Sequence, residues 1–192
     1  FQGLNADRLY RSEKVPYAFN YVDGTLDWTH DNDDQGDHGT HVAGIAAANR
    51  LETTDVVGVA PDAQLLIMKV FGANGGAYFD DILACLEDCY VLNVDVVNMS
   101  LGTPAGFTSL SPEIDEIFAR ILQSDMVAAI AAGNSYSAAY MNGTGTNRNQ
   151  TSDPDNGIMS SPASYIGATA VASVENSAIR FNYVELENGA KI

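Results

Sequence analysis

The side chains best suited to chemistry lie in residues 37–45, which include His38 and His41. A histidine at the start of a helix can present its imidazole to a cleft and act as a general base near neutral pH. A single histidine is more often structural, and two at this spacing could bind a metal, but this helix contains no Glu that would complete such a site. The small residues Gly39, Ala43 and Gly44 would let the helix approach a sheet closely.

Two other polar segments each follow an apolar stretch. Residues 127–132 lead into Gly133 and Asn134, and an asparagine there can donate its amide N–H to a developing oxyanion, or cap a turn or helix. Residues 96–99 lead into 100–102, whose backbone could pair with an extended peptide. The glycine-rich residues 72–76 could form the opposite edge of such a groove, or a simple turn.

Hydrophobic periodicity predicts the helices and strands that must position these residues. After a loop-rich stretch to about residue 35, it predicts a buried helix over 38–49 and further helices over 80–92 and 111–123. Strands are predicted over 63–71, 94–99, 126–132 and 166–174, with 126–132 buried. This alternation predicts an α/β fold with a doubly wound, mostly parallel sheet, which binds ligands at the carboxyl ends of its strands. Both polar segments follow predicted strands, so a site is expected at that edge.

Composition excludes some functions. The chain has 192 residues, 46% of them hydrophobic, which is enough for a folded core. Its formal charge of −16 argues against nucleic-acid binding, which needs Lys and Arg to neutralise phosphates. No apolar run is long enough to span a membrane in this segment.

Two further clusters have competing interpretations. The acidic run 31–37 is either a solvated loop, a calcium site or a group that tunes the nearby histidine. Cys85 and Cys89 stand four residues apart on a predicted helix. Zinc would need two more ligands there, and a disulfide within one helical turn is geometrically awkward. We interpret them as two small buried thiols.

Four segments together resemble the subtilase family of serine proteases, namely residues 38–44 (HGTHVAG), 58–63 (GVAPDA), 98–102 (NMSLG) and 131–134 (AAGN). Their order and spacing also fit, and the resemblance covers roughly residues 15 to 176. Within the family the chain looks most similar to the large cell-envelope proteinases of the lactocepin type. The segments that indicate this are 14–21 and 167–173.

The resemblance implies a serine endopeptidase with a subtilisin-like fold, acting on protein or peptide substrates outside a bacterial cell, secreted or held at the envelope. It makes His38 the general base and then acid, Asn134 the side-chain oxyanion donor, and His41 structural. No cofactor is implied for the chemistry, and a structural calcium ion is left open. The implied substrate-binding residues form two walls, Ser100, Leu101 and Gly102 on one side and Ala131, Ala132 and Gly133 on the other.

The departures from the family pattern concern the catalytic triad. No strand ending in Asp-Ser-Gly or Asp-Thr-Gly precedes His38, and Asp23 is a poor substitute. No Gly-Thr-Ser nucleophile motif follows Asn134, and Ser160 and Ser161 lack the glycine that should precede a nucleophile. We expect both triad partners outside this chain.

The expected organisation follows from these departures. Residues 1–176 would form the central part of an incomplete catalytic domain, and 177–192 the start of an inserted domain. The chain alone would then be inactive. The alternative is a non-catalytic relative that uses the groove as a peptide-binding module. A nucleotide-binding domain is disfavoured because no Gly-x-Gly-x-x-Gly follows a strand.

Overall fold

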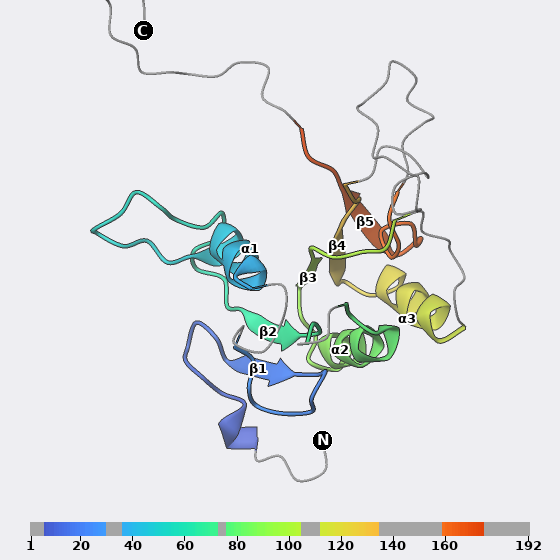
Figure 1. The fold of residues 1–192 in the computed structure, drawn as a ribbon, viewed down its shortest axis with the longest axis horizontal. Helices are drawn as coiled ribbons and strands as arrows, with labels where there is room; N and C mark the ends of the chain where they lie inside the picture. The colour runs from blue at the N-terminus through green and yellow to red at the C-terminus, as the bar shows by residue number, and fades with distance from the viewer. Residues whose placement is uncertain (1–5, 30–35, 73–75, 105–111, 135–158, 175–192) are drawn as a thin grey trace, which may run out of the picture.

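A computed structural model describes residues 6–29, 36–72, 76–104, 112–134 and 159–174. Within them lie a short 3₁₀ helix, three α-helices and five strands (Figure 1). Their bounds are η1 Ala6–Arg8, β1 Tyr17–Asn20, α1 His38–Ala47, β2 Leu66–Lys69, α2 Phe79–Val91, β3 Val96–Met99, α3 Pro112–Leu122, β4 Val127–Ala131 and β5 Ala168–Val171.

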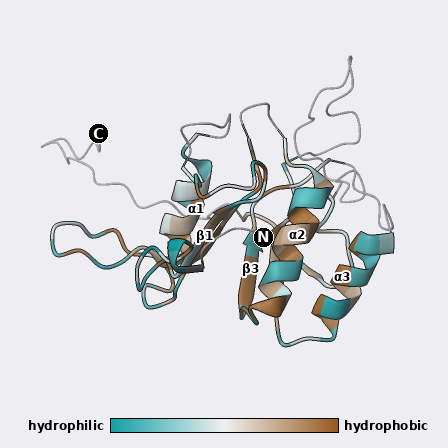
Figure 2. Cartoon of the chain, turned by 90° about the horizontal axis from the view of Figure 1, so that it is seen from below, coloured by the Kyte–Doolittle hydropathy of each residue, from teal (hydrophilic) through white to brown (hydrophobic). Residues whose placement is uncertain are grey.

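Every strand pair of the described chain is parallel, which confirms the predicted α/β class. The strands form two sheets rather than one, in the orders β1-β2 and β3-β4-β5, and β2 and β3 are not paired within the described residues. α1 lies on one side of the strands, and α2 and α3 lie on the other (Figures 1 and 2). No helix in the described ranges has the length and apolar character needed to cross a membrane.

Helix α3 forms because its sequence suits both its ends and its inner face. Pro112 occupies its first position, where a missing N–H costs nothing. Glu113 and Asp115 stand in the first turn and Arg120 in the last, as the helix dipole favours. Its buried face repeats at helical spacing and consists of Ile114, Ile117, Phe118 and Ile121.

Helix α2 buries Ile82, Leu86 and Cys89, as its periodicity predicts. Two residues beyond its end lies Asn93, whose positive φ of 53° is the left-handed conformation typical of helix ends. Asn93 donates its N–H to the carbonyl of Tyr90 at 3.2 Å, and Val94 donates to that of Cys89 at 3.2 Å. This pair of bonds is a Schellman motif, and it turns the chain from α2 into β3.

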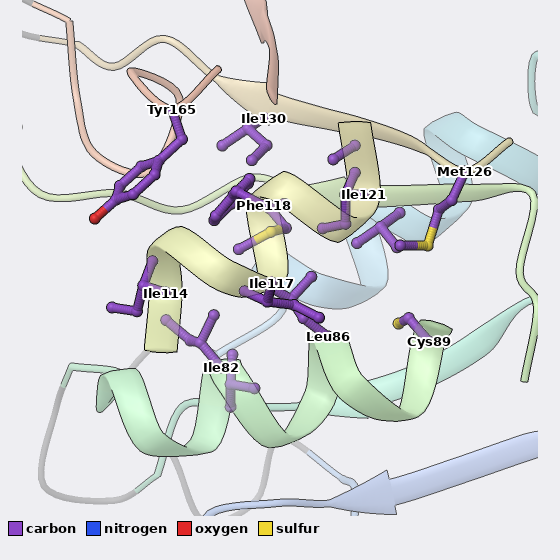
Figure 3. Close-up of a cluster of buried hydrophobic side chains, with 14 of the residues drawn as sticks. Ile82, Leu86, Cys89, Ile114, Ile117, Phe118, Ile121, Met126, Ile130 and Tyr165 are labelled. Atoms are coloured by element: carbon purple, nitrogen blue, oxygen red, sulfur yellow. The ribbon is translucent and has the colours of Figure 1, made fainter. Parts of the chain in front are cut away.

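The main hydrophobic core lies where α2 and α3 pack together beneath β3 and β4 (Figure 3). Ile117, Ile121 and Ile130 are almost completely buried there. The Phe118 and Tyr165 rings stack with centroids 4.8 Å apart, which joins α3 to the segment before β5. This core fixes the carboxyl ends of β3 and β4 relative to each other.

Three sequence-based expectations were wrong. The stretch before residue 35 contains β1, a mostly buried strand that was missed because it is only four residues long and mixes aromatic and polar residues. β4 is not buried on both faces, since Val127 is 47% exposed while Ala128 and Ile130 are buried. Helix α1 buries only Ala47, and a Cβ added at Gly39 or Gly44 would meet open space, so neither glycine is close-packed against another described element.

Candidate active site

The two polar segments come together at one edge of the three-stranded sheet. β3 and β4 are parallel neighbours, with Met99 aligned to Ile130. The chain therefore leaves the sheet at Ser100 from one strand and at Ala131–Ala132 from the next, on the same edge. This confirms the expectation that both segments follow the carboxyl ends of adjacent strands.

A third segment, residues 159–161, is bonded to both of these strand ends. Thr103 donates its N–H to the carbonyl of Ser161 at 2.9 Å, and Ser161 donates back to Thr103 at 3.0 Å. Ser160 donates its N–H to the carbonyl of Ala132 at 2.8 Å. Residues 100–103 and 131–133 are thus fixed on either side of one backbone segment.

Ser160 lies against both predicted walls of the substrate site. A Cβ added at Gly133 would stand 2.1 Å from the Ser160 Oγ, and one added at Gly102 would stand 3.0 Å from its Cβ. Gly133 also has a φ of 109°, which residues with a side chain rarely adopt. A side chain at Gly133 would therefore collide with Ser160, and one at Gly102 would require its neighbours to shift by a few tenths of an ångström.

Sequence analysis missed Ser160, which it considered only as a nucleophile. The available signal was the pair of glycines, Gly102 and Gly133, at corresponding positions after two strands. Such glycines indicate that a third segment approaches closely.

His38 is the first residue of α1, and its side chain is exposed. The far end of this helix is held by residues 58–60. The N–H groups of Gly58, Val59 and Ala60 donate to carbonyls in the last turn, those of Ala48, Ile45 and Ala46, at 2.9, 3.0 and 2.8 Å. These bonds satisfy acceptors that a helix end leaves unpaired. The segment 58–60 therefore positions the histidine helix through its backbone.

Asn134 follows Gly133 directly and is exposed, and the roles of His38 and Asn134 remain predictions. Asp23 has a structural role in the fold, in agreement with the interpretation that it is a poor substitute for the triad aspartate. It accepts a hydrogen bond from the Asn20 Nδ2 at 2.9 Å and donates its N–H to the Asn20 Oδ1 at 3.1 Å, which closes the turn after β1.

Comparison with known proteins decides the family. The model of the subtilase family matches residues 4–189, nearly the whole chain. The chain belongs to the subtilase family.

Its similarity to individual relatives agrees with the motif-based interpretation. It is 39% identical over 190 residues to a PII-type proteinase of Lacticaseibacillus paracasei, covering 94% of this chain and 10% of that protein. It is 36% identical over 152 residues to subtilisin DY of Bacillus licheniformis, covering 79% of this chain and 48% of the relative. This subtilase chain therefore spans about a tenth to a half of the length of these curated relatives.

The solved structure of the S41 psychrophilic protease shares the fold of this subtilase chain. The TM-score is 0.62 at 28% sequence identity, over 98% of this chain and 53% of that one. The subtilisin-like fold predicted from the motifs is thus confirmed, as is the resemblance to the large proteinases of lactic-acid bacteria.

Metal binding in this subtilase chain was expected, if anywhere, at the acidic run 31–37. Most of that run lies outside the described residues, so the calcium site stays an expectation. Among the residues that the structure describes, no group of three or more His, Cys, Asp or Glu side chains could hold a metal ion. Cys85 and Cys89 are free thiols, the first half-buried and the second buried.

Proposed function

We propose that this chain forms the central part of a serine endopeptidase that hydrolyses peptide bonds in proteins. The observation that carries the proposal is the arrangement at the edge of the β3–β4 pair. Two strand ends stand side by side there, and each carries a glycine against Ser160. Membership of the subtilase family supports the same reaction.

In this proposal an extended substrate lies along residues 100–102 and binds through its backbone. Among the described residues, Leu101 and Gly102 take part in no backbone hydrogen bond outside helices and strands, and the proposal assigns their N–H and C=O groups to the peptide. Backbone pairing tolerates many side chains, which suits an enzyme that degrades varied proteins. The segment 131–133 forms the other wall.

The chemistry is that of acyl transfer. His38 takes the proton of a serine nucleophile and then gives it to the leaving amine. The Asn134 side-chain amide donates to the oxyanion that develops on the scissile carbonyl. The nucleophile and the aspartate that orients His38 are expected from other segments of the whole protein.

The direct test is Asn134→Ala in the complete protein. The turnover number should fall about 100- to 1,000-fold with little change in KM, because the amide is needed only when charge develops. That magnitude is known for subtilisin, a member of the same family, and is carried over rather than derived. Asn49→Ala, on an exposed loop after α1, is the matched control and should leave both constants unchanged.

Two outcomes would contradict the proposal. A raised KM with an unchanged turnover number would make Asn134 a binding or structural residue. A complete wild-type protein that binds peptides without cleaving them would be the non-catalytic relative considered above.

The site should prefer a medium or large uncharged residue before the cut. Its described walls contain no charged side chain, and Ser160 fills the space between Gly102 and Gly133. Ser160→Gly removes this side chain, and should raise kcat/KM for aromatic over small residues at that position about tenfold. Substrate profiling of the wild type and of Ser160→Gly measures this ratio. Dominance of Lys or Arg before the cut in the wild-type profile would contradict the predicted preference for uncharged residues.

We also propose that the enzyme works outside the cytoplasm, secreted or attached to the cell envelope. The support is the similarity to large bacterial proteinases and the strongly acidic composition, which suits a soluble protein that does not bind nucleic acid. Fractionation of the producing cells tests this, and recovery of the protein in the cytoplasm alone would contradict it.

A further inference from the structure

Three sulfur atoms from two elements converge away from the proposed active site. The Cys85 Sγ lies 3.1 Å and the Cys89 Sγ 3.3 Å from the Sδ of Met68. The two thiols stand on one face of α2, one turn apart, and Met68 projects from β2. Both thiols thus contact the same thioether sulfur between the helix and the strand.

Thiolates and thioethers are the ligands that favour Cu(I). Zinc is a poorer match, since its structural sites take four Cys or His ligands, and no larger group of such side chains exists among the described residues. A disulfide between the thiols would require bridging one turn of a helix, which is strained. We propose that Cys85, Cys89 and Met68 form a three-coordinate site for a single Cu(I) ion.

The geometry needs only a small adjustment to admit the ion. If the metal–sulfur distance is close to the about 2.3 Å of zinc–thiolate bonds, trigonal coordination separates the sulfurs by about 4 Å. The two thiol-to-thioether separations, 3.1 and 3.3 Å, would have to widen by about 0.7–0.9 Å to reach that value. Methionine has three rotatable side-chain bonds, and both Cys85 and Met68 are only half-buried, so movement and entry from solvent are both available.

The proton balance of binding is defined by the two thiols. Each thiolate that binds the ion gives its proton to solvent, so one Cu(I) displaces two protons and no electron is transferred.

The carboxylate of Asp88, the residue before Cys89, accepts a hydrogen bond from a nearby hydroxyl group. The Tyr21 hydroxyl donates to the Asp88 Oδ2 at 2.7 Å, and it lies 2.9 Å from the Tyr17 hydroxyl. One oxygen of Asp88 therefore already has a hydrogen-bond donor other than the sulfur atoms. The proposed ligand set remains purely sulfur.

The test is anaerobic titration of the purified protein with Cu(I) in competition with a chromophoric Cu(I) chelator. We expect one high-affinity ion per chain, and X-ray absorption should show three sulfur neighbours. Cys85→Ser and Cys89→Ser should each weaken binding by more than the roughly 10- to 100-fold that loss of an outer-shell partner costs. Met68→Leu should weaken it less and reduce the sulfur count to two.

The matched control is Met99→Leu, which changes a buried methionine of the core to a side chain of similar volume. Circular dichroism of each variant should match the wild type, so that lost binding is not lost folding. Wild-type affinity in Met68→Leu, or no high-affinity ion in the wild type, would overturn the site. Proteolysis is not part of the readout, so this result is independent of the proposed function.

Discussion

The two sides of the proposed active site are held in place in different ways. The oxyanion side follows β4, whose Ile130 is buried in the same core as Ile117 and Ile121 of α3. The histidine side is α1, which buries only Ala47 and leaves Ile45 56% exposed. Side-chain packing fixes the first, whereas backbone hydrogen bonds from residues 58–60 hold the second.

This difference explains why the burial of the histidine helix was predicted wrongly. A packed face restricts residue type at every third or fourth position. A helix held by backbone groups is under no such restriction, so the apolar residues of α1 predicted its extent but not its exposure. The segment that holds it includes Gly58, where an added Cβ would stand 2.3 Å from the backbone nitrogen of Ala48.

The largest expected effect contrasts two isoleucines of these regions. Ile121→Ala leaves a cavity in the α2–α3 core and should lower the free energy of unfolding by about 2–5 kcal/mol. Ile45→Ala truncates an exposed side chain and should change it by less than about 0.5 kcal/mol. Chemical denaturation of both variants measures the difference. Equal losses would mean that α1 is packed as tightly as α3, and the comparison would fail.

The second prediction concerns two glycines at the histidine helix. Gly58→Ala forces the 58–60 segment away from the end of α1 and should destabilise the protein by about 1–3 kcal/mol. Gly44→Ala is the matched control. Its Cβ meets open space, so it should stabilise the helix by about 0.5–1 kcal/mol. Thermal unfolding should show a lower melting temperature for Gly58→Ala and a higher one for Gly44→Ala. A stabilising Gly58→Ala would show that the backbone hydrogen bonds from residues 58–60 do not hold the helix.

Much of the fold could be predicted from the sequence because its helices carry their own signals. The periodic face of α3, with Pro112 at its start, identified that helix to within one residue at each end. Strand β1 could not be found in this way. Its four residues, Tyr17–Asn20, are buried by pairing with β2 and by contacts distant in sequence, which no local pattern records.

The candidate site was predicted in part for the same reason. Asn134 and the segment 100–102 follow apolar strands, so their shared edge could be inferred from the fold class alone. The contribution of Ser160 depends on backbone bonds to Thr103 and Ala132 made through residues 160 and 161, far along the chain. The glycines Gly102 and Gly133 could indicate that some segment approaches closely, but not that this segment is 160–161.

The smallest expected effect is at the end of α2, where Asn93 adopts its left-handed conformation. Asn93→Ala should cost about 1 kcal/mol, since alanine tolerates this conformation poorly, whereas Asn93→Gly should be nearly neutral. The cost should stay below that of Gly58→Ala because α2 is also held by Ile82, Leu86 and Cys89 in the core. Urea denaturation of the three variants ranks them. If Asn93→Ala proved the more damaging, helix caps would matter more than packing even in the buried region, and the contrast between the two sides of the site would have to be abandoned.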